Sequence, residues 1–143
     1  MSKKKKIKNI DTTRKILPEA FIVPDEPRIE YPVFSFIHVS TQHCLLSEWK
    51  SNELIELLTA LKHMESITWN QLPNHKGLDF TKIDTNRLSK PLPSNVSPEV
   101  SVYEISVCPK KRIFGYRIYG NIFRILWFDR EHEVVPFRKV RRA

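Results

Sequence analysis

Hydrophobic and polar residues alternate most regularly in RIFGYRIYGNIFRILWFD, residues 112–129. Two alternating runs flank Gly120-Asn121, and glycine in the first of two loop positions is typical of a tight β-hairpin. With a two-residue loop, one face of the hairpin carries only large apolar side chains: Phe114, Tyr116, Ile118, Phe123, Ile125 and Trp127. The pattern predicts a hairpin that buries this face in the core.

The same register places Arg117 directly opposite Arg124 on the other face. Two like charges in facing positions destabilise a sheet unless a partner offsets the repulsion. Either a phosphate binds between the two guanidinium groups, or each pairs with a carboxylate such as Glu104 or a helix glutamate. In the first interpretation Tyr119 stacks on a base, and Gly115 lets a ligand backbone come close.

Period-two alternation also predicts strands in VFSFIHVS, residues 33–40, and VSVYEISVC, residues 100–108. A last short strand is expected in VVPFRKV, residues 134–140, at a sheet edge because it contains Pro136.

A helical period appears in SEWKSNELIELLTALKHM, residues 47–64, with Ser47 or Ser51 as the capping residue. The apolar stripe of this helix comprises Leu54, Leu57, Leu58, Leu61 and Met64. Thr68 and Gln71 resemble a capping box and predict a second, short helix in SITWNQLPN, residues 66–74.

The order of these elements predicts an α+β domain over residues 31–140. Its antiparallel sheet has about four to five strands, and both helices pack on one face. Residues 1–30 combine a lysine run with several prolines, which predicts a basic, mostly disordered or extended tail. Residues 74–99 form a long irregular connection whose shape the pattern does not predict.

The net charge of +8 is unevenly divided along the chain. Residues 1–15 contain seven basic residues and one acidic residue. Residues 19–104 contain seven basic and twelve acidic residues, and residues 110–143 contain ten basic and three acidic residues. Two basic ends on either side of an acidic middle favour a polyanion as the binding partner. Nucleic acid is favoured over an anionic membrane, because the sequence has no basic amphipathic helix. The alternative is a solubilising tail. The expected nucleic-acid contacts near the hairpin are Lys110, Lys111, Arg112 and Arg130.

The segment WFDREHE adds Asp129, Glu131 and His132 at the open end of the hairpin. A histidine beside two arginines could cleave a phosphodiester, because it exchanges protons near neutral pH while the arginines stabilise charge on phosphorus. The alternatives are a solvated polar turn and, with weaker support, a metal site. We expect neither a metal nor a cofactor, and the candidate catalytic residues are Arg117, Arg124, His132 and Tyr119.

Other candidates are expected to be structural. Four histidines lie on separate elements: His38, His43, His63 and His75. Trp49 and Trp69 should pack onto the sheet. Cys44 and Cys108 have no metal-binding spacing and predict reduced thiols. No apolar run approaches the ~20 residues of a membrane span, and the start lacks a signal-peptide pattern, so a cytoplasmic location is expected.

The stretch RIFGYRIYGNIFRILWFDREHEVVP, after a strand and two helices, resembles the RelE/ParE superfamily of small bacterial toxins. It is also similar to uncharacterised bacterial and phage-borne proteins with LTW helices and a terminal F-x-x-x-W-F-D-x-x-H pattern. The matching residues are Ile67-Thr68-Trp69 and Phe123, Trp127, Phe128, Asp129 and His132. The likeness covers roughly residues 33–136.

This resemblance implies an RNA-binding domain of the toxin-antitoxin type. In its ribonuclease branch the 2′-hydroxyl attacks the adjacent phosphate without a metal. Arg112, Arg117 and Arg124 would then hold the phosphate, with Tyr119 or His132 near the attacking or leaving oxygen. The implied partners are RNA, including ribosome-associated mRNA, and an antitoxin protein. The alternative function is a non-catalytic module that binds nucleic acid or a protein.

Overall fold

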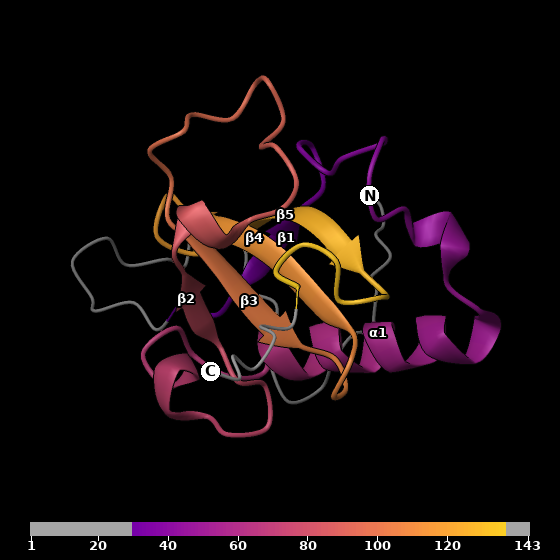
Figure 1. Ribbon diagram of the computed structural model, residues 1–143. Helices are drawn as coiled ribbons and strands as arrows, with labels where there is room; N and C mark the ends of the chain where they lie inside the picture. The colour runs from indigo at the N-terminus through magenta and orange to yellow at the C-terminus, as the bar shows by residue number, and fades with distance from the viewer. Residues whose placement is uncertain (1–29, 137–143) are drawn as a thin grey trace, which may run out of the picture.

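The computed structural model describes residues 30–136, which form a five-stranded sheet in the order β1-β5-β4-β3-β2 with one α-helix (Figure 1). The elements are β1 (Val33–Ser35), α1 (Ser51–Glu65), β2 (Thr81–Ile83), β3 (Val102–Ser106), β4 (Arg112–Ile118) and β5 (Ile122–Asp129). The predicted α+β class and the number of strands are confirmed. No helix in this part of the chain is long and apolar enough to cross a membrane.

The sheet is mixed rather than antiparallel. Strands β2 to β5 form an antiparallel meander, but β1 pairs with β5 in parallel orientation. A parallel pair requires a long connection, and the chain between β1 and β5 contains α1 and three further strands. Strand β2 lies inside the stretch whose shape the sequence pattern did not predict.

Two elements differ from the prediction at their ends. Strand β1 stops at Ser35, well before the expected end at residue 40. Residues 134–136 contain no strand, and the rest of the expected last strand lies outside the described residues, as do residues 1–29 of the predicted tail.

The predicted second helix is wrong, although its capping box forms. The N–H of Thr68 donates to Gln71 Oε1 (3.2 Å), and the N–H of Gln71 donates to Thr68 Oγ1 (3.3 Å). The chain then makes only a three-residue 3-10 turn, Leu72–Asn74. Pro73 has no N–H to donate to the preceding turn, so the helix cannot propagate.

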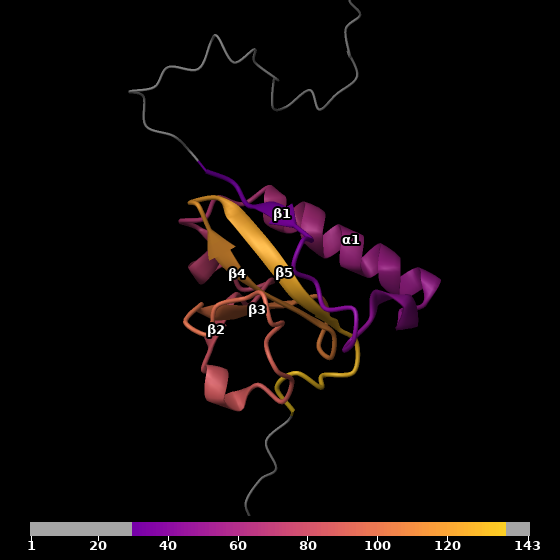
Figure 2. The ribbon, with the colours of Figure 1, turned by 90° about the horizontal axis from the view of Figure 1, so that it is seen from above.

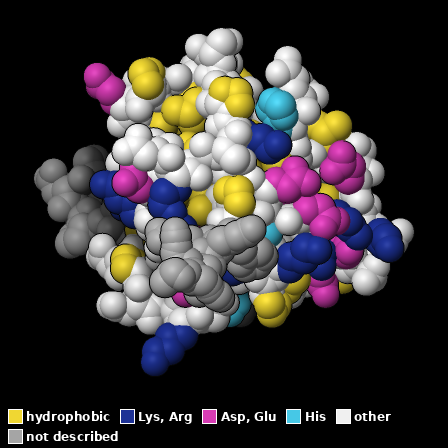
Figure 3. Space-filling model, viewed as in Figure 1, with side chains coloured by type: hydrophobic (Ala, Val, Ile, Leu, Met, Phe, Trp, Pro, Cys, Tyr) yellow, Lys and Arg dark blue, Asp and Glu magenta, His cyan; other side chains and the backbone are white. Residues whose placement is uncertain are grey.

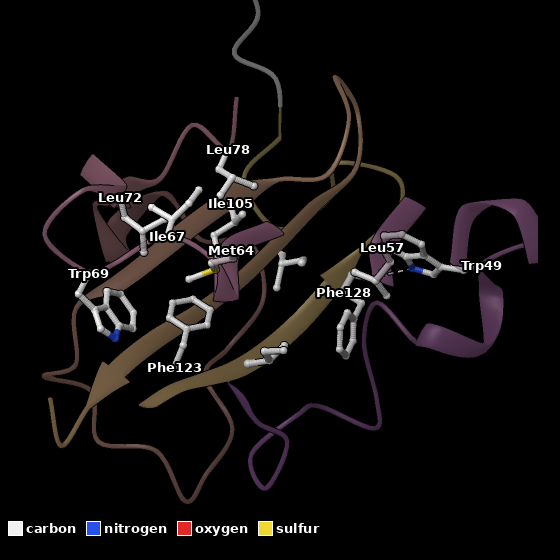
Figure 4. Close-up of a cluster of buried hydrophobic side chains, with 12 residues drawn as sticks. Trp49, Leu57, Met64, Ile67, Trp69, Leu72, Leu78, Ile105, Phe123 and Phe128 are labelled. Atoms are coloured by element: carbon white, nitrogen blue, oxygen red, sulfur yellow. Dashed lines mark hydrogen bonds between the residues drawn. The ribbon is translucent and has the colours of Figure 1, made fainter. Parts of the chain in front are cut away.

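Helix α1 covers one face of the sheet, where it builds a first hydrophobic core (Figures 2 and 4). Leu57 and Met64 are buried against Phe123 and Phe128 of β5, while Trp49 Nε1 donates to the Phe128 carbonyl (3.3 Å). The predicted packing of both helix-region tryptophans, Trp49 and Trp69, is confirmed. The buried stripe is narrower than predicted, because Leu54 and Leu58 are 38% and 54% exposed.

The start of α1 also differs from the expected serine cap. The helix begins at Ser51, and Glu53 Oε1 accepts the backbone N–H of Lys50 (2.8 Å). A carboxylate therefore closes the first turn, where it also interacts favourably with the helix dipole.

Irregular segments cover the opposite face and build a second core (Figure 2). The core residues are Ile83, Val96, Val102, Phe114, Tyr116, Leu126, Trp127, Val134 and Val135. Asp129 is fully buried, and its carboxylate accepts the N–H groups of Glu133 and Val134 (2.8 Å each). Ser89 N–H donates to the Val134 carbonyl (2.7 Å). The Ser89 bond ties the 84–100 loop to the segment after β5. Because this segment and the loop cover the face opposite α1, both faces of the sheet are buried.

The β4–β5 hairpin has two registers along its length. Phe114 faces Trp127 as predicted, but nearer the turn Tyr116 faces Arg124 and Arg117 faces Phe123. The change occurs at a β-bulge that leaves Leu126 as an extra residue on β5.

The bulge overturns the predicted loop and the predicted apolar face. Three residues, 119–121, connect the strands, with positive φ at Tyr119 (53°) and Gly120 (81°). A shift of one residue moves side chains to the other face of a strand. Consequently Phe123 and Ile125 belong to the α1 core, whereas Phe114 and Tyr116 belong to the second core.

Candidate functional site

Arg117 and Arg124 lie on opposite faces of the sheet, so the predicted facing pair is wrong. Arg117 points to the α1 face, where its Cζ lies 4.2 Å from the ring centroid of Trp69. It also forms an ion pair with Glu30 (3.6 Å) and donates through Nε to the Gly120 carbonyl. Its charge is thus met by a ring, a carboxylate and a backbone oxygen.

Gly115 is required for packing rather than for the approach of a ligand. A Cβ at this position would lie 2.6 Å from a ring carbon of Phe123 and 2.3 Å from the Arg124 carbonyl oxygen. The Phe123 ring therefore occupies the space that the sequence suggested for a ligand backbone.

Arg124 lies on the second face, in a row across three strands. Its neighbours at this level are Ser35 on β1 and Tyr116 on β4. The Arg124 side chain is half-buried, and its buried Nε has no hydrogen-bond partner within residues 30–136. A buried guanidinium N–H without a partner loses its hydration without compensation, which makes this position suited to an anion.

His38 adds a titratable group to this row. Its Nδ1 lies 2.7 Å from the hydroxyl of Tyr116, and the two rings stack with centroids 6.3 Å apart. Because Tyr116 engages Nδ1, the ring nitrogen available to a ligand is Nε2. We define Arg124, Tyr116 and His38 as the arginine-histidine site.

A cleft adjoins this site. It has a volume of about 510 Å³ and lies between residues 37–43, which include His38, and residues 91–95. Both loops stand on the second face, away from α1 (Figure 1). His38 is the residue of the arginine-histidine site that lines this cleft.

His38 and Tyr116 were absent from the predicted site. Tyr116 looked like a core residue from its alternation, and His38 looked like an isolated histidine. They meet because β1 pairs with the last strand and the chain after β1 turns back toward β4. No local pattern encodes that approach.

Tyr119 and His132 lie at opposite ends of the hairpin. Tyr119 is 76% exposed at the turn, whereas His132 follows the open end and is half-buried with φ of 62°. The four predicted catalytic residues therefore do not converge on one point.

Glu104, which the sequence offered as a partner for Arg117 or Arg124, pairs instead with Arg112. Arg112 Nε lies 3.5 Å from Glu104 Oε2, and Arg112 Nη1 donates to Ser106 Oγ and to the Cys108 carbonyl (3.3 Å). Burial raises the pKa of Glu104, while the neighbouring Arg112 and His132 oppose that rise. The Arg112 side chain is therefore engaged by groups of strand β3 and of the turn that follows it.

The two lysines of the β3–β4 turn are also paired. Lys110 Nζ lies 2.8 Å from Glu131, and Lys111 Nζ lies 3.7 Å from Glu53 and 3.8 Å from Glu56. Basic and acidic side chains are intermixed on the face shown in Figure 3. The expected contacts thus lie among acidic groups instead of forming a uniform basic patch.

Arg130 joins the start of α1 to the end of β5. Its Nε and Nη2 contact the two oxygens of Glu53 (2.6 and 3.0 Å), and Nη1 contacts Glu131. Glu53 is only 8% exposed. The hydrogen bond from Arg130, followed by that from the Lys50 N–H, lowers the pKa of Glu53 to about 2. This bidentate pair is a structural clamp.

The metal site considered for Asp129, Glu131 and His132 finds no support within the described residues. No group of three or more His, Cys, Asp or Glu residues among them is placed to hold a metal ion. Both cysteines are free thiols, and Cys44 Sγ lies 3.9 Å from Asp129 Oδ1. Burial, with a further contribution from Asp129, raises the pKa of Cys44 to about 12, which keeps this thiol protonated.

Comparisons with family models, with curated proteins and with solved structures find no match to this chain. The resemblance to the RelE/ParE superfamily therefore stays a prediction.

Proposed function

We propose that this protein binds RNA on the second face of the sheet, with Arg124 holding a phosphate. The observation that carries the proposal is the buried Nε of Arg124, which has no hydrogen-bond partner within residues 30–136 and lies on the strand next to Tyr116, the hydrogen-bonding partner of His38. A guanidinium offers a planar fork of donors that matches phosphate oxygens. A phosphate at this point would supply the missing partner.

The charge distribution supports a polyanion as the ligand. Residues 30–136 contain twelve basic and twelve acidic residues, so the excess positive charge belongs to residues 1–29 and 137–143. These terminal sequences would supply long-range, salt-dependent attraction, while the arginine-histidine site positions one phosphate. The two contributions have different experimental signatures.

The same site supports cleavage of the bound RNA. His38 Nε2 would accept the proton of a ribose 2′-hydroxyl as that oxygen attacks the adjacent phosphorus. Arg124 would stabilise the charge on the phosphoryl oxygens. The bond from phosphorus to the 5′-oxygen would break, and the leaving oxygen would take a proton from water, yielding a 2′,3′-cyclic phosphate and a 5′-hydroxyl.

The charge balance also supports the alternative of non-catalytic binding. Most basic side chains around the hairpin have acidic neighbours, so RNA or an acidic protein could bind mainly through the terminal sequences. In that case Arg124 would make no difference to affinity. An antitoxin partner has no support beyond the resemblance.

A pair of arginine variants tests the binding proposal. Arg124→Ala should weaken binding of a short single-stranded RNA at least about tenfold at fixed salt, since a hydrogen bond to a charged group contributes about 1.5–3 kcal/mol. Arg117→Ala is the matched control, because it removes the same charge from the opposite face of the same hairpin. Fluorescence anisotropy measures both affinities, and thermal unfolding checks that each variant is folded. Equal loss in the two variants would assign binding to overall charge.

His38→Ala tests cleavage separately. We expect it to abolish release of 2′,3′-cyclic phosphate products from a labelled RNA while RNA affinity stays within roughly twofold, because the imidazole moves a proton rather than holding the phosphate. Products are resolved by gel electrophoresis and phosphatase sensitivity. Binding without cleavage by the wild-type protein would leave the non-catalytic alternative.

A further inference from the structure

The cleft beside the arginine-histidine site has the size and lining of a binding pocket. Its volume of about 510 Å³ lies within the range of roughly 300–1,000 Å³ that is usual for small-molecule sites. His38 belongs both to the cleft lining and to the site, so the two are contiguous.

The lining of the cleft combines apolar and polar side chains. Pro91, Leu92 and Pro93 form an apolar wall, onto which the flat face of an aromatic ring can pack. Gln42 and Asn95 line the same cleft, and both are exposed. An amide side chain presents a donor and an acceptor side by side, which is the arrangement found on the edge of a nucleobase.

The ligand of the cleft can be inferred from the covalent bond between phosphate and nucleoside in RNA. In RNA each phosphate is bonded to a nucleoside on either side, so an RNA whose phosphate is held by Arg124 carries a nucleoside that can extend past His38 into the cleft. Single-stranded RNA is recognised mainly through splayed-out bases that stack and that form hydrogen bonds along their edges.

We infer that this cleft binds the nucleobase next to the phosphate held by Arg124, and that Gln42 and Asn95 set a base preference. This inference rests on the proposed function. It adds a specificity-determining pocket built from two loops on the second face, residues 37–43 and 91–95.

The test compares four labelled single-stranded RNA oligomers of equal length, each with a different base at one central position. The wild-type protein should prefer one base by at least roughly fivefold in fluorescence anisotropy, as expected from base-edge hydrogen bonds. Gln42→Ala and Asn95→Ala should each reduce that preference. The double variant should bind all four oligomers within roughly twofold of one another.

Two controls separate the inference from the proposed function. Asn86→Ala removes an exposed amide from the same irregular cover outside the cleft and should keep the preference. Arg124→Ala should weaken all four oligomers by the same factor. If Arg124→Ala behaves so but the wild type shows no preference, or the double variant keeps it, the inference fails and the proposed function stands. If Arg124→Ala has no effect, or the wild type binds no RNA, both fail.

Discussion

The two faces of the sheet are covered by different kinds of structure. On one face a regular helix packs on β5 and β1, and the cations nearby are matched, as with Arg117 on Trp69 and Arg130 on Glu53. On the other face the buried Asp129 carboxylate holds the backbone of Glu133 and Val134, and the Val134 carbonyl accepts the N–H of Ser89 from the neighbouring loop. Arg124, whose buried Nε has no hydrogen-bond partner within residues 30–136, lies on this second face.

This difference suits the two faces to different tasks, stability on the α1 face and ligand binding on the second face. A helix satisfies its own backbone groups, and the cleft along α1, at about 300 Å³, is smaller than the cleft of about 510 Å³ between the loops of the second face. Irregular loops leave clefts between them, and their position depends on a few polar contacts. The second face is therefore both the better place for a ligand and the one more easily disrupted by a single substitution.

The largest loss in unfolding free energy is expected from Asp129→Ala, on the second face. The variant leaves the N–H groups of Glu133 and Val134 without acceptors and releases the loop that is joined through Ser89. At about 1–3 kcal/mol for each unsatisfied buried group, we expect roughly 3 kcal/mol lower unfolding free energy in urea titrations. Glu131→Ala, which removes only exposed ion pairs in the same turn, should change it by about 1 kcal/mol or less. Similar values for both variants would mean that Asp129 does not hold this cover.

Gly115→Ala tests how tightly the Phe123 ring of the α1 core packs against the hairpin at the bulge. The added methyl group would overlap the Phe123 ring and the Arg124 carbonyl, so we expect a loss of about 1–3 kcal/mol in unfolding free energy. Gly77→Ala is the matched control, because its Cβ would meet only the flexible His75 ring at 3.1 Å and 3.6 Å. A stable Gly115→Ala variant would show that Phe123 can move, and that the α1 core is less tightly packed than described.

Glu53→Gln tests the clamp on the α1 face through pH. The folded-state pKa of Glu53 is lowered from 4.5 to about 2, so its stabilising contribution is complete above pH 4.5 and is lost as pH falls toward 2. The stability difference between wild type and variant should therefore shrink across this window. Urea unfolding at several pH values measures it. Glu56→Gln, an exposed neighbour on the same helix, should show little change; equal pH dependence would argue against the clamp.

The smallest effect is expected from Arg117→Lys. Lysine keeps the charge near Glu30 but loses the planar contact with Trp69, which is worth about 0.5–1 kcal/mol at such a site. Thermal unfolding measures the change, and Arg124→Lys on the opposite face provides the comparison. If both substitutions have the same effect on stability, Arg117 has no special role on the α1 face.

The local pattern predicted those elements whose residues interact with near neighbours in the chain. The apolar period of residues 54–64 yields α1, and the alternation around 112–129 yields the hairpin, with Phe114 opposite Trp127 as expected. Even the Thr68 and Gln71 capping box forms. The α+β class follows, because a helix stripe and several alternating strands can bury their apolar surfaces only against one another.

The tertiary structure decided the register and therefore the site. A single bulge at Leu126 moves Arg124 away from Arg117, and the parallel return of β1 brings His38 to Tyr116. Both depend on contacts between residues far apart in the chain, chiefly the packing of two opposed cores against one sheet. Alternation has a period of two, so one extra residue reverses the face on which every subsequent side chain lies, and no local pattern records where that residue is accommodated.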